Sequence, residues 1–162
     1  MTGPVPTTDE LATELVEARD AFLSELDRIE PASLTTPGLV GEWSGRELVA
    51  HLGYWAGHAT EVIHAVVTDR ADEVGVDEPP TDEVNATVAR IARDTPLATV
   101  RKREAASVEA LLDRLHALDP ALLEVTLPGG AILAEAIRDD GADHYRGHAE
   151  ALRQALDGGA RG

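Results

Sequence analysis

Two histidines, His144 and His148, stand four residues apart near the end of the chain. In a helix this spacing places two side chains on one face, one turn apart, where two imidazoles can bind the same metal ion. A third histidine, His51, lies in a distant apolar segment and can face the same interior. Three neutral imidazoles leave one coordination position open, as in catalytic zinc sites. The pattern therefore predicts a divalent-metal site formed by His51, His144 and His148.

Each of these histidines also has a simpler interpretation. A single histidine beside an apolar stripe is more often a core residue with satisfied hydrogen bonds, or a half-exposed residue, than a metal ligand. Burying two imidazoles side by side is costly, however, unless their ring nitrogens find partners. We therefore base the expectation of metal binding on the three histidines together and not on His51 alone.

Five further residues are candidates to line a pocket beside the histidines. His58 lies two turns beyond His51 and could replace it as a ligand. Glu104 follows the apolar line of its segment with Arg101 nearby, so the two could act as an acid or base or as a clamp on a substrate. A surface salt bridge is the alternative for this pair. Tyr54 and Trp55 could line the mouth of the cavity, although aromatic residues at helical spacing more often belong to the core.

Four other residues carry weaker expectations. Tyr145 could also line the cavity mouth or belong to the core. Asp143 could orient a ligating imidazole by accepting a hydrogen bond from its ring, but an exposed helix carboxylate is the simpler interpretation. We expect His64 and His116 to face solvent or the edges of helices.

The composition limits both the chemistry and the partners of such a site. The chain has no cysteine, which excludes a disulfide framework, a thiolate nucleophile of its own and a cysteine-ligated zinc. Its 30 acidic and 14 basic residues give a net charge of -16. Because such a surface repels phosphate backbones and anionic lipid headgroups, we expect a small-molecule substrate, no nucleic acid and no membrane partner.

Apolar residues recur at steps of three and four and predict four helices. The first begins at Thr8 and ends before Pro31. The second begins at Ser44 and ends near Arg70. Ser44 and Glu47 have the spacing of a capping box, in which the Ser44 side chain accepts from the Glu47 amide and the Glu47 side chain accepts from the Ser44 amide.

The third and fourth helices follow an acidic segment, residues 71–80, that we expect to be an exposed loop. The third begins at Thr81, faces Val84, Val88 and Ile91 inwards and is broken near Pro96. The fourth runs from residue 131 to about residue 156 and is closed by two glycines, residues 158 and 159. It would carry the two paired histidines in the middle of its apolar stripe.

These elements predict an all-α fold, a four-helix bundle whose third helix is broken. Strong helix formers dominate, and only 3% of the residues are aromatic. At 162 residues the chain fits one domain, residues 8–157, after a flexible tail of residues 1–7. No segment has the roughly 18 consecutive apolar residues that span a bilayer, and the first residues lack the pattern of a signal peptide. We therefore expect a cytoplasmic protein.

Two motifs resemble those of the DinB/YfiT-like metalloenzyme superfamily. Residues 43–55, WSGRELVAHLGYW, are similar to its second-helix signature, in which a tryptophan precedes the helix and a histidine faces the centre. Residues 143–148, DHYRGH, are similar to its last-helix signature, with two histidines four apart. Within the superfamily the motifs most resemble the ClbS/DfsB branch, and the mycothiol-dependent maleylpyruvate isomerase branch is the nearest in chemistry. The order of elements matches over about residues 8–156.

The resemblance implies that His51, His144 and His148 bind zinc, nickel or a similar divalent ion in a bundle that is often dimeric. It also implies a transferase or isomerase that uses a low-molecular-weight thiol such as mycothiol or bacillithiol. ClbS-type members instead protect against a cyclopropane-bearing genotoxin by hydrolysis and need not use a metal. The isomerase branch has a carboxylate where this chain has His144, so the resemblance does not extend to that ligand.

Three functional hypotheses follow. The first is a metal-dependent enzyme of detoxification, in which an external thiol or water attacks an electrophilic small molecule at the ion. The second is a small-molecule binding or stress-protective module that performs no chemistry, and the third is an interaction domain whose interior is filled by side chains. Metal content separates the first hypothesis from the second, and a pocket beside His51 separates both from the third.

Overall fold

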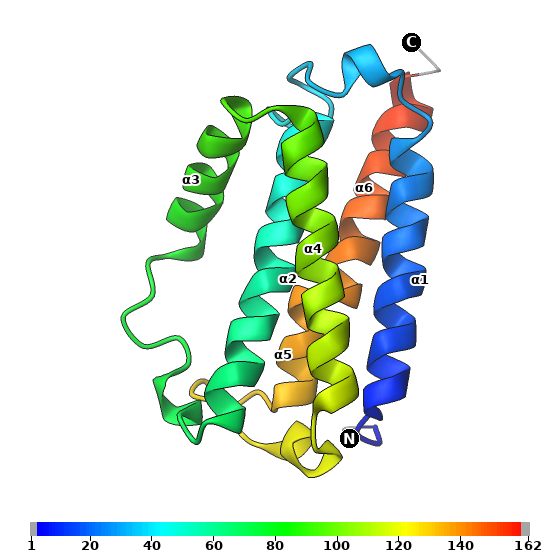
Figure 1. Cartoon of the computed structure of the whole chain (residues 1–162). Coiled ribbons are helices and arrows are strands. Elements are labelled where there is room, and N and C mark those ends of the chain that lie inside the picture. The colour runs from blue at the N-terminus through cyan, green and yellow to red at the C-terminus, as the bar shows by residue number, and fades with distance from the viewer. Residues whose placement is uncertain (1–2, 160–162) are drawn as a thin grey trace.

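Four helical rods lie side by side and form the body of the protein (Figure 1). The structure is a computed structural model, and it describes residues 3–159. Helix α4 packs between α1 and α2, α6 packs along α1, and α5 packs against α2. The predicted all-α four-helix bundle is confirmed. Its rods are α1 (Thr8–Leu26), α2 (Gly45–Val67), α4 (Leu97–Ala117), and a last rod made of α5 (Leu133–Asp140) and α6 (Ala142–Gly159).

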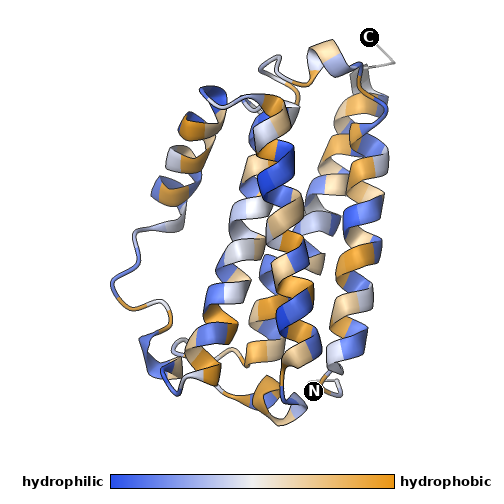
Figure 2. Ribbon diagram, viewed as in Figure 1, coloured by the Kyte–Doolittle hydropathy of each residue, from blue (hydrophilic) through white to orange (hydrophobic). Residues whose placement is uncertain are grey.

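The interior between the rods is a continuous apolar core. Figure 2 shows apolar and polar residues alternating along the helices, as expected where one face is buried and the other is exposed. Each fully buried aliphatic or aromatic side chain contributes about 1.5–3 kcal/mol through removal from water. The largest fully buried side chains come from every rod and include Leu15, Phe22, Leu48, Leu52, Ile63, Leu111, Leu133, Tyr145 and Leu152.

Short elements connect the rods. Three 3-10 turns are found at Pro31–Ser33, Ala71–Glu73 and Pro120–Glu124. Residues 3–159 contain no strand, although two isolated bridges pair Val40 with Trp43 and Thr126 with Ile132. The acidic segment 71–80 is mostly exposed, as predicted.

Helix α3 (Thr81–Arg93) lies outside the bundle and packs mainly on α2. The sequence predicted it as the first half of a broken third helix, but the chain turns at residues 94–96 and α3 leaves the line of α4 (Figure 1). Its buried residues are Ala89 and Ala92, whereas Ile91, predicted to face inwards, is 50% exposed. A helix with one neighbour buries only a narrow stripe, and small residues let that stripe approach α2 closely.

A glycine sets the distance between α2 and α4. A Cβ atom added at Gly53 would lie 2.9 Å from the Cα atom of Glu104, closer than two such atoms can approach. The two helices therefore come together at a position where no side chain larger than hydrogen fits on α2. This contact positions the part of α2 that carries His51.

A second glycine divides the last rod into two helices, where the sequence predicted one. Gly141, with φ -107° and ψ -104°, ends α5, and α6 begins at the next residue. The core-facing residues of α6 are Tyr145, Ala149 and Leu152, so the paired histidines lie beside the apolar stripe and not in its middle. The rod begins at Leu133, two residues later than predicted, and both terminal glycines lie within α6, which extends to the last described residue.

The helix starts differ from the predicted ones in detail. Ser44 accepts a hydrogen bond from the Glu47 amide at 3.4 Å, but the Glu47 carboxylate accepts from the Ser44 hydroxyl and not from the Ser44 amide. The complete capping box belongs to α1, where Thr7 and Glu10 satisfy each other's backbone amides. Thr7 therefore caps a helix although the sequence placed it in the tail.

We predict that Gly141→Ala destabilises the protein by about 2 kcal/mol, because the new Cβ atom meets crowded backbone. It would lie 2.9 Å from the carbonyl oxygen of Ile137. Urea denaturation monitored by circular dichroism measures the loss. Gly147→Ala is the matched control, because a Cβ atom there has nothing within 4 Å and the site is helical. Equal stability of the two variants would refute the role of Gly141.

Candidate metal centre

The three predicted histidines converge from two rods. His51 projects from α2, and His144 and His148 project from successive turns of α6. The Nε2 atom of His144 lies 2.7 Å from Nε2 of His51 and 3.1 Å from Nε2 of His148. One ligand atom from each residue lies within 4.8 Å of the others. The structure thus brings together side chains that are 93 residues apart in sequence.

All three imidazoles are neutral at neutral pH. Burial, followed by the neighbouring His144 and His148 rings, lowers the pKa of His51 to about 3. Burial and the His148 ring lower the pKa of His144 to about 4. Burial alone lowers the pKa of His148. Each ring therefore keeps a free lone pair, which is the form that binds a metal ion.

Hydrogen bonds among the histidines cannot satisfy their nitrogens. The single lone pair on His144 Nε2 can accept one strong hydrogen bond, yet two other ring nitrogens lie within hydrogen-bond distance of it. In addition, Nδ1 of His51 is buried and has no partner among the described residues. One divalent cation would accept all three Nε2 lone pairs, and tetrahedral zinc places such nitrogens about 3.3 Å apart. The residues present fit a metal ion better than a hydrogen-bonded cluster.

A depression of about 310 Å³ leads from the surface to this centre. Helix α3 forms one side of it through Thr81 and Asn85. The indole of Trp55 donates a hydrogen bond to Asn85 Oδ1 at 2.9 Å, which links α2 to α3 at the mouth. The predicted pocket candidate Trp55 therefore does line the site. The remaining lining residues are His51, His144, Asp139 and Asp140.

His58, predicted as a possible substitute ligand, has a different set of partners. Its Nδ1 lies 2.6 Å from Asp140 Oδ2, and its Nε2 lies 3.2 Å from Glu78 Oε1. The hydrogen bond to Asp140 is the main reason that the pKa of His58 is raised to about 9, against an opposing effect of burial. A protonated imidazole has no lone pair for a metal, so His58 connects α2 to α5 and to the acidic loop instead.

Glu104 forms a partly buried ion pair with Arg19. It does not form the surface salt bridge with Arg101 that was the alternative to a role in the pocket. It is 3% exposed, and its carboxylate accepts from Arg19 Nε at 2.6 Å and Arg19 Nη2 at 2.8 Å. Tyr145 also donates its hydroxyl to Glu104 at 2.6 Å. Burial is the main reason that the pKa of Tyr145 is raised, so the phenol stays a donor. This network joins α1, α4 and α6 directly beside His144.

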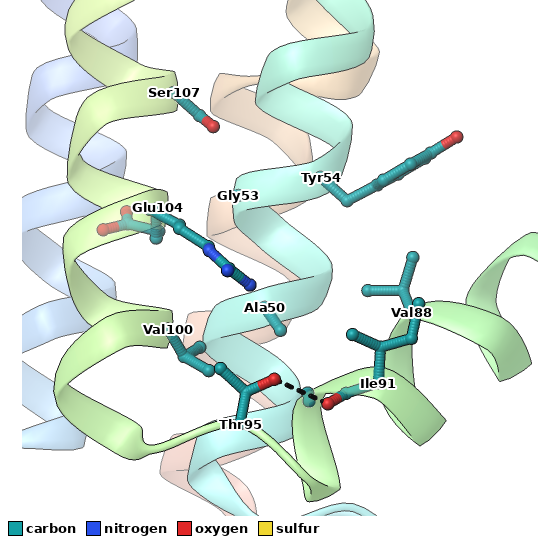
Figure 3. A pocket seen from close by; sticks show the side chains of 11 residues that line it. Ala50, Gly53, Tyr54, Val88, Ile91, Thr95, Val100, Glu104 and Ser107 are labelled. Atoms are coloured by element: carbon teal, nitrogen blue, oxygen red, sulfur yellow. Dashed lines mark hydrogen bonds between the residues drawn. The ribbon is translucent and has the colours of Figure 1, made fainter.

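The other pocket candidates do not share one pocket. Tyr54 and Glu104 line a second, largely apolar cavity of about 260 Å³ between α2, α3 and α4. Figure 3 shows that the Glu104 carboxylate points away from this cavity. Arg101, predicted to act with Glu104, lines neither this cavity nor the histidine depression.

The residues with weaker expectations take mostly structural positions. Tyr145 is fully buried in the core. Asp143 is exposed and pairs with Arg146, so it does not orient a ring of the centre. His116 is exposed and His64 is half-buried near the end of α2, as predicted.

Sequence reasoning missed three residues that shape the site. Asp139 and Asp140 line the depression, and Asp140 stands four residues before His144, a spacing that places both on one helical face and could have signalled it. Asn85 carries no such signal. Its place at the mouth depends on how α3 docks on α2, which no local pattern specifies.

Comparison with known proteins supports the fold and the resemblance. The sequence profile described as the DinB superfamily matches residues 14–150. An uncharacterised protein from Escherichia coli UTI89 has a TM-score of 0.78 at 14% identity, over 96% of both chains. The colibactin self-resistance protein ClbS in complex with dsDNA has a TM-score of 0.75 at 16% identity, over 96% of this chain and 98% of that one. No curated protein matches the sequence.

The mycothiol-dependent maleylpyruvate isomerase is a further structural neighbour. Its TM-score is 0.70 at 18% identity, over 91% of this chain but only 61% of the isomerase. At such identities the likeness of these solved structures shows a shared fold and not a shared activity.

The expectation that nucleic acid is excluded as a partner is wrong. ClbS, which has this fold, was solved in complex with double-stranded DNA. Net charge averages over the whole surface, whereas contact with a phosphate backbone depends on the local distribution of charge, so a value of -16 does not exclude it. Within residues 3–159, no helix is long and apolar enough to cross a membrane.

We predict that Glu104→Ala lowers the free energy of unfolding by about 3 kcal/mol, because it leaves Arg19 and the Tyr145 hydroxyl without their buried acceptor. Urea denaturation measures this loss. Glu109→Ala, which removes an exposed carboxylate from the same helix, is the control and should change stability little. If both variants unfold at the same urea concentration, the buried network does not hold α6 in place.

We predict that His58 titrates near pH 9, because its raised pKa reflects two carboxylate partners. A pKa raised on folding contributes stability that is complete below the unfolded value of about 6.5 and is lost as pH rises through the folded value. The difference in the free energy of unfolding between the wild type and His58→Gln should therefore decrease from pH 7 to pH 10. Nuclear magnetic resonance of the ring protons gives the midpoint, and a midpoint near 6.5 would contradict the ion pair.

Proposed function

Because this chain belongs to the DinB superfamily, we propose that it is a divalent-metal-dependent enzyme acting on electrophilic small molecules with a low-molecular-weight thiol, as a transferase or isomerase. The observation that carries the proposal is the convergence of three neutral imidazoles at Nε2 distances of 2.7 and 3.1 Å. The depression lined by His51 and His144 gives a small molecule access to two of these three rings.

His51, His144 and His148 would hold zinc or nickel through their Nε2 atoms. Bound there, such an ion would lower the pKa of a thiol or water in its open position. The three residues contribute no charge of their own, since their pKa values are lowered by burial. Neutral ligands leave the full positive charge of the ion available to a thiolate.

The chain's other residues would position the reactants. It has no cysteine, so the thiol must come from outside, and mycothiol or bacillithiol are the candidates that the family resemblance suggests. Trp55 offers an apolar wall at the mouth, held in place by Asn85. The Asn85 amide hydrogens remain free to donate to a bound molecule, because its oxygen is the atom that accepts from Trp55.

We further propose that the protein is a homodimer, which the family resemblance supports, and that it is located in the cytoplasm. Size-exclusion chromatography with light scattering tests the assembly directly. A mass twice that of one chain supports the dimer, and the mass of one chain refutes it.

Metal analysis of the protein purified without a histidine tag tests the proposal. We predict about one ion per chain in the wild type and a loss of most of it in His148→Ala, because two imidazoles bind far less tightly than three. His116→Ala is the matched control, since it removes an exposed histidine from another helix. Circular dichroism confirms that each variant remains helical.

Metal that survives in His148→Ala, or a wild type that binds none when zinc or nickel is added, contradicts the metal centre. The protein would then be a binding or stress-resistance module, or a protective hydrolase of the ClbS type that needs no ion. Where metal is bound, transfer assays with mycothiol, bacillithiol and glutathione test the thiol. Activity that needs both the thiol and His148 supports the enzyme.

A further inference from the structure

The depression that leads to the three histidines has an acidic rim. Asp139 and Asp140, at the carboxyl end of α5, line the same depression as His51 and His144. Among the described residues, no arginine or lysine lines it. A molecule that enters therefore meets carboxylates before it reaches the histidines.

Neighbouring cations neutralise only part of this rim. His58, the nearest cation, is shared between Asp140 and Glu78. Arg138 is engaged by both oxygens of Glu14 at 2.9 Å. Asp139 has no ion-pair partner within residues 3–159. Asp139 is thus left without an ion-pair partner, and Arg138, which Glu14 already holds, offsets only part of its charge.

The surroundings of Asp139 favour the arrival of a cation. Burial, followed by the nearby carboxylates of Asp143, Asp140 and Glu135, raises the pKa of Asp139. These neighbours destabilise its ionised form, and a cation placed against it would relieve the repulsion. An incoming anion would add to the repulsion.

Independent of the rim, the interior of the depression also points to a ligand. His51 is only 5% exposed, lines the depression, and has one ring nitrogen without a partner. The acidic rim and the convergent imidazoles therefore belong to one site, with a reacting end at the histidines and a charged end at α5.

We propose that this site selects a reactant that bears a protonated amine or guanidinium group, with Asp139 as the residue that determines the specificity. The inference rests on the proposed function, because the reacting part of the molecule would lie at the histidine centre. Trp55 would cover the apolar part between the two ends. Opposite charges a few ångströms apart at a partly exposed site attract each other and like charges repel each other, so dicarboxylates are disfavoured.

Three small thiols of similar size test the selection. Cysteamine is a cation, 2-mercaptoethanol is neutral and mercaptoacetate is an anion at pH 7. Each is titrated into the cobalt-loaded protein, and the visible absorption of cobalt(II), which takes the same nitrogen ligands as zinc, reports binding and not activity. Because the thiols differ in basicity, the quantity compared between proteins is the ratio of cysteamine affinity to mercaptoacetate affinity.

Asp139→Asn should lower this ratio roughly tenfold at low salt. Glu109→Gln, which changes the net charge equally on a helix that contributes nothing to the depression, should leave it unchanged. A ratio that is the same in the wild type and Asp139→Asn overturns the inference and leaves the metal centre standing. A protein that binds no cobalt refutes the proposed function instead.

If the protein binds no cobalt, a measurement without metal still tests whether Asp139 favours cations at the depression. In the Trp43→Phe variant the remaining tryptophan is Trp55, which lines the depression. Its fluorescence should be quenched more efficiently by cesium than by iodide, and Asp139→Asn should reduce the difference. If the difference between cesium and iodide quenching is the same with and without Asp139→Asn, the proposed preference for cations is overturned.

Discussion

Three imidazoles, one buried and two half-buried, point their ring nitrogens at one another, and the rest of the structure depends on this arrangement. In isolation this arrangement is unfavourable, since Nε2 of His144 lies close to two other ring nitrogens and can satisfy only one of them. It persists because His51 is held on a rod whose position is set by unrelated contacts. The energetic cost of the bare site is the physical reason to expect a cation there.

Those contacts surround the centre on several sides. Gly53, two residues after His51, lets α2 approach α4 closely. Glu104 joins the opposite face of α4 to Arg19 and to Tyr145. Since Tyr145 directly follows His144 in the chain, the buried carboxylate also determines where α6 presents its histidines. A residue that looked like a candidate acid or base therefore acts as a structural anchor.

The rim of the site is built from α3, which lies outside the bundle, and from the carboxyl end of α5. Helix α3 and the end of α5 supply Asn85 and Asp139, while His58 connects α2 to Asp140. Helix α3 buries only Ala89 and Ala92, so its sequence can vary with little effect on the core.

Local pattern was sufficient for the all-α class, for the bundle and for pairing His144 with His148 on one helical face, because helical periodicity and i, i+4 spacing are properties of neighbouring residues. Local pattern could not predict that Arg19 pairs with Glu104 or that Tyr54 and Trp55 line different cavities. It also could not predict that α3 lies outside the bundle. Each of these depends on which surfaces meet across the fold. The break at Gly141 also lies where the rods pack closely, since a side chain there would meet Leu15 of α1 and Leu111 of α4 as well as the carbonyl oxygen of Ile137 four residues earlier.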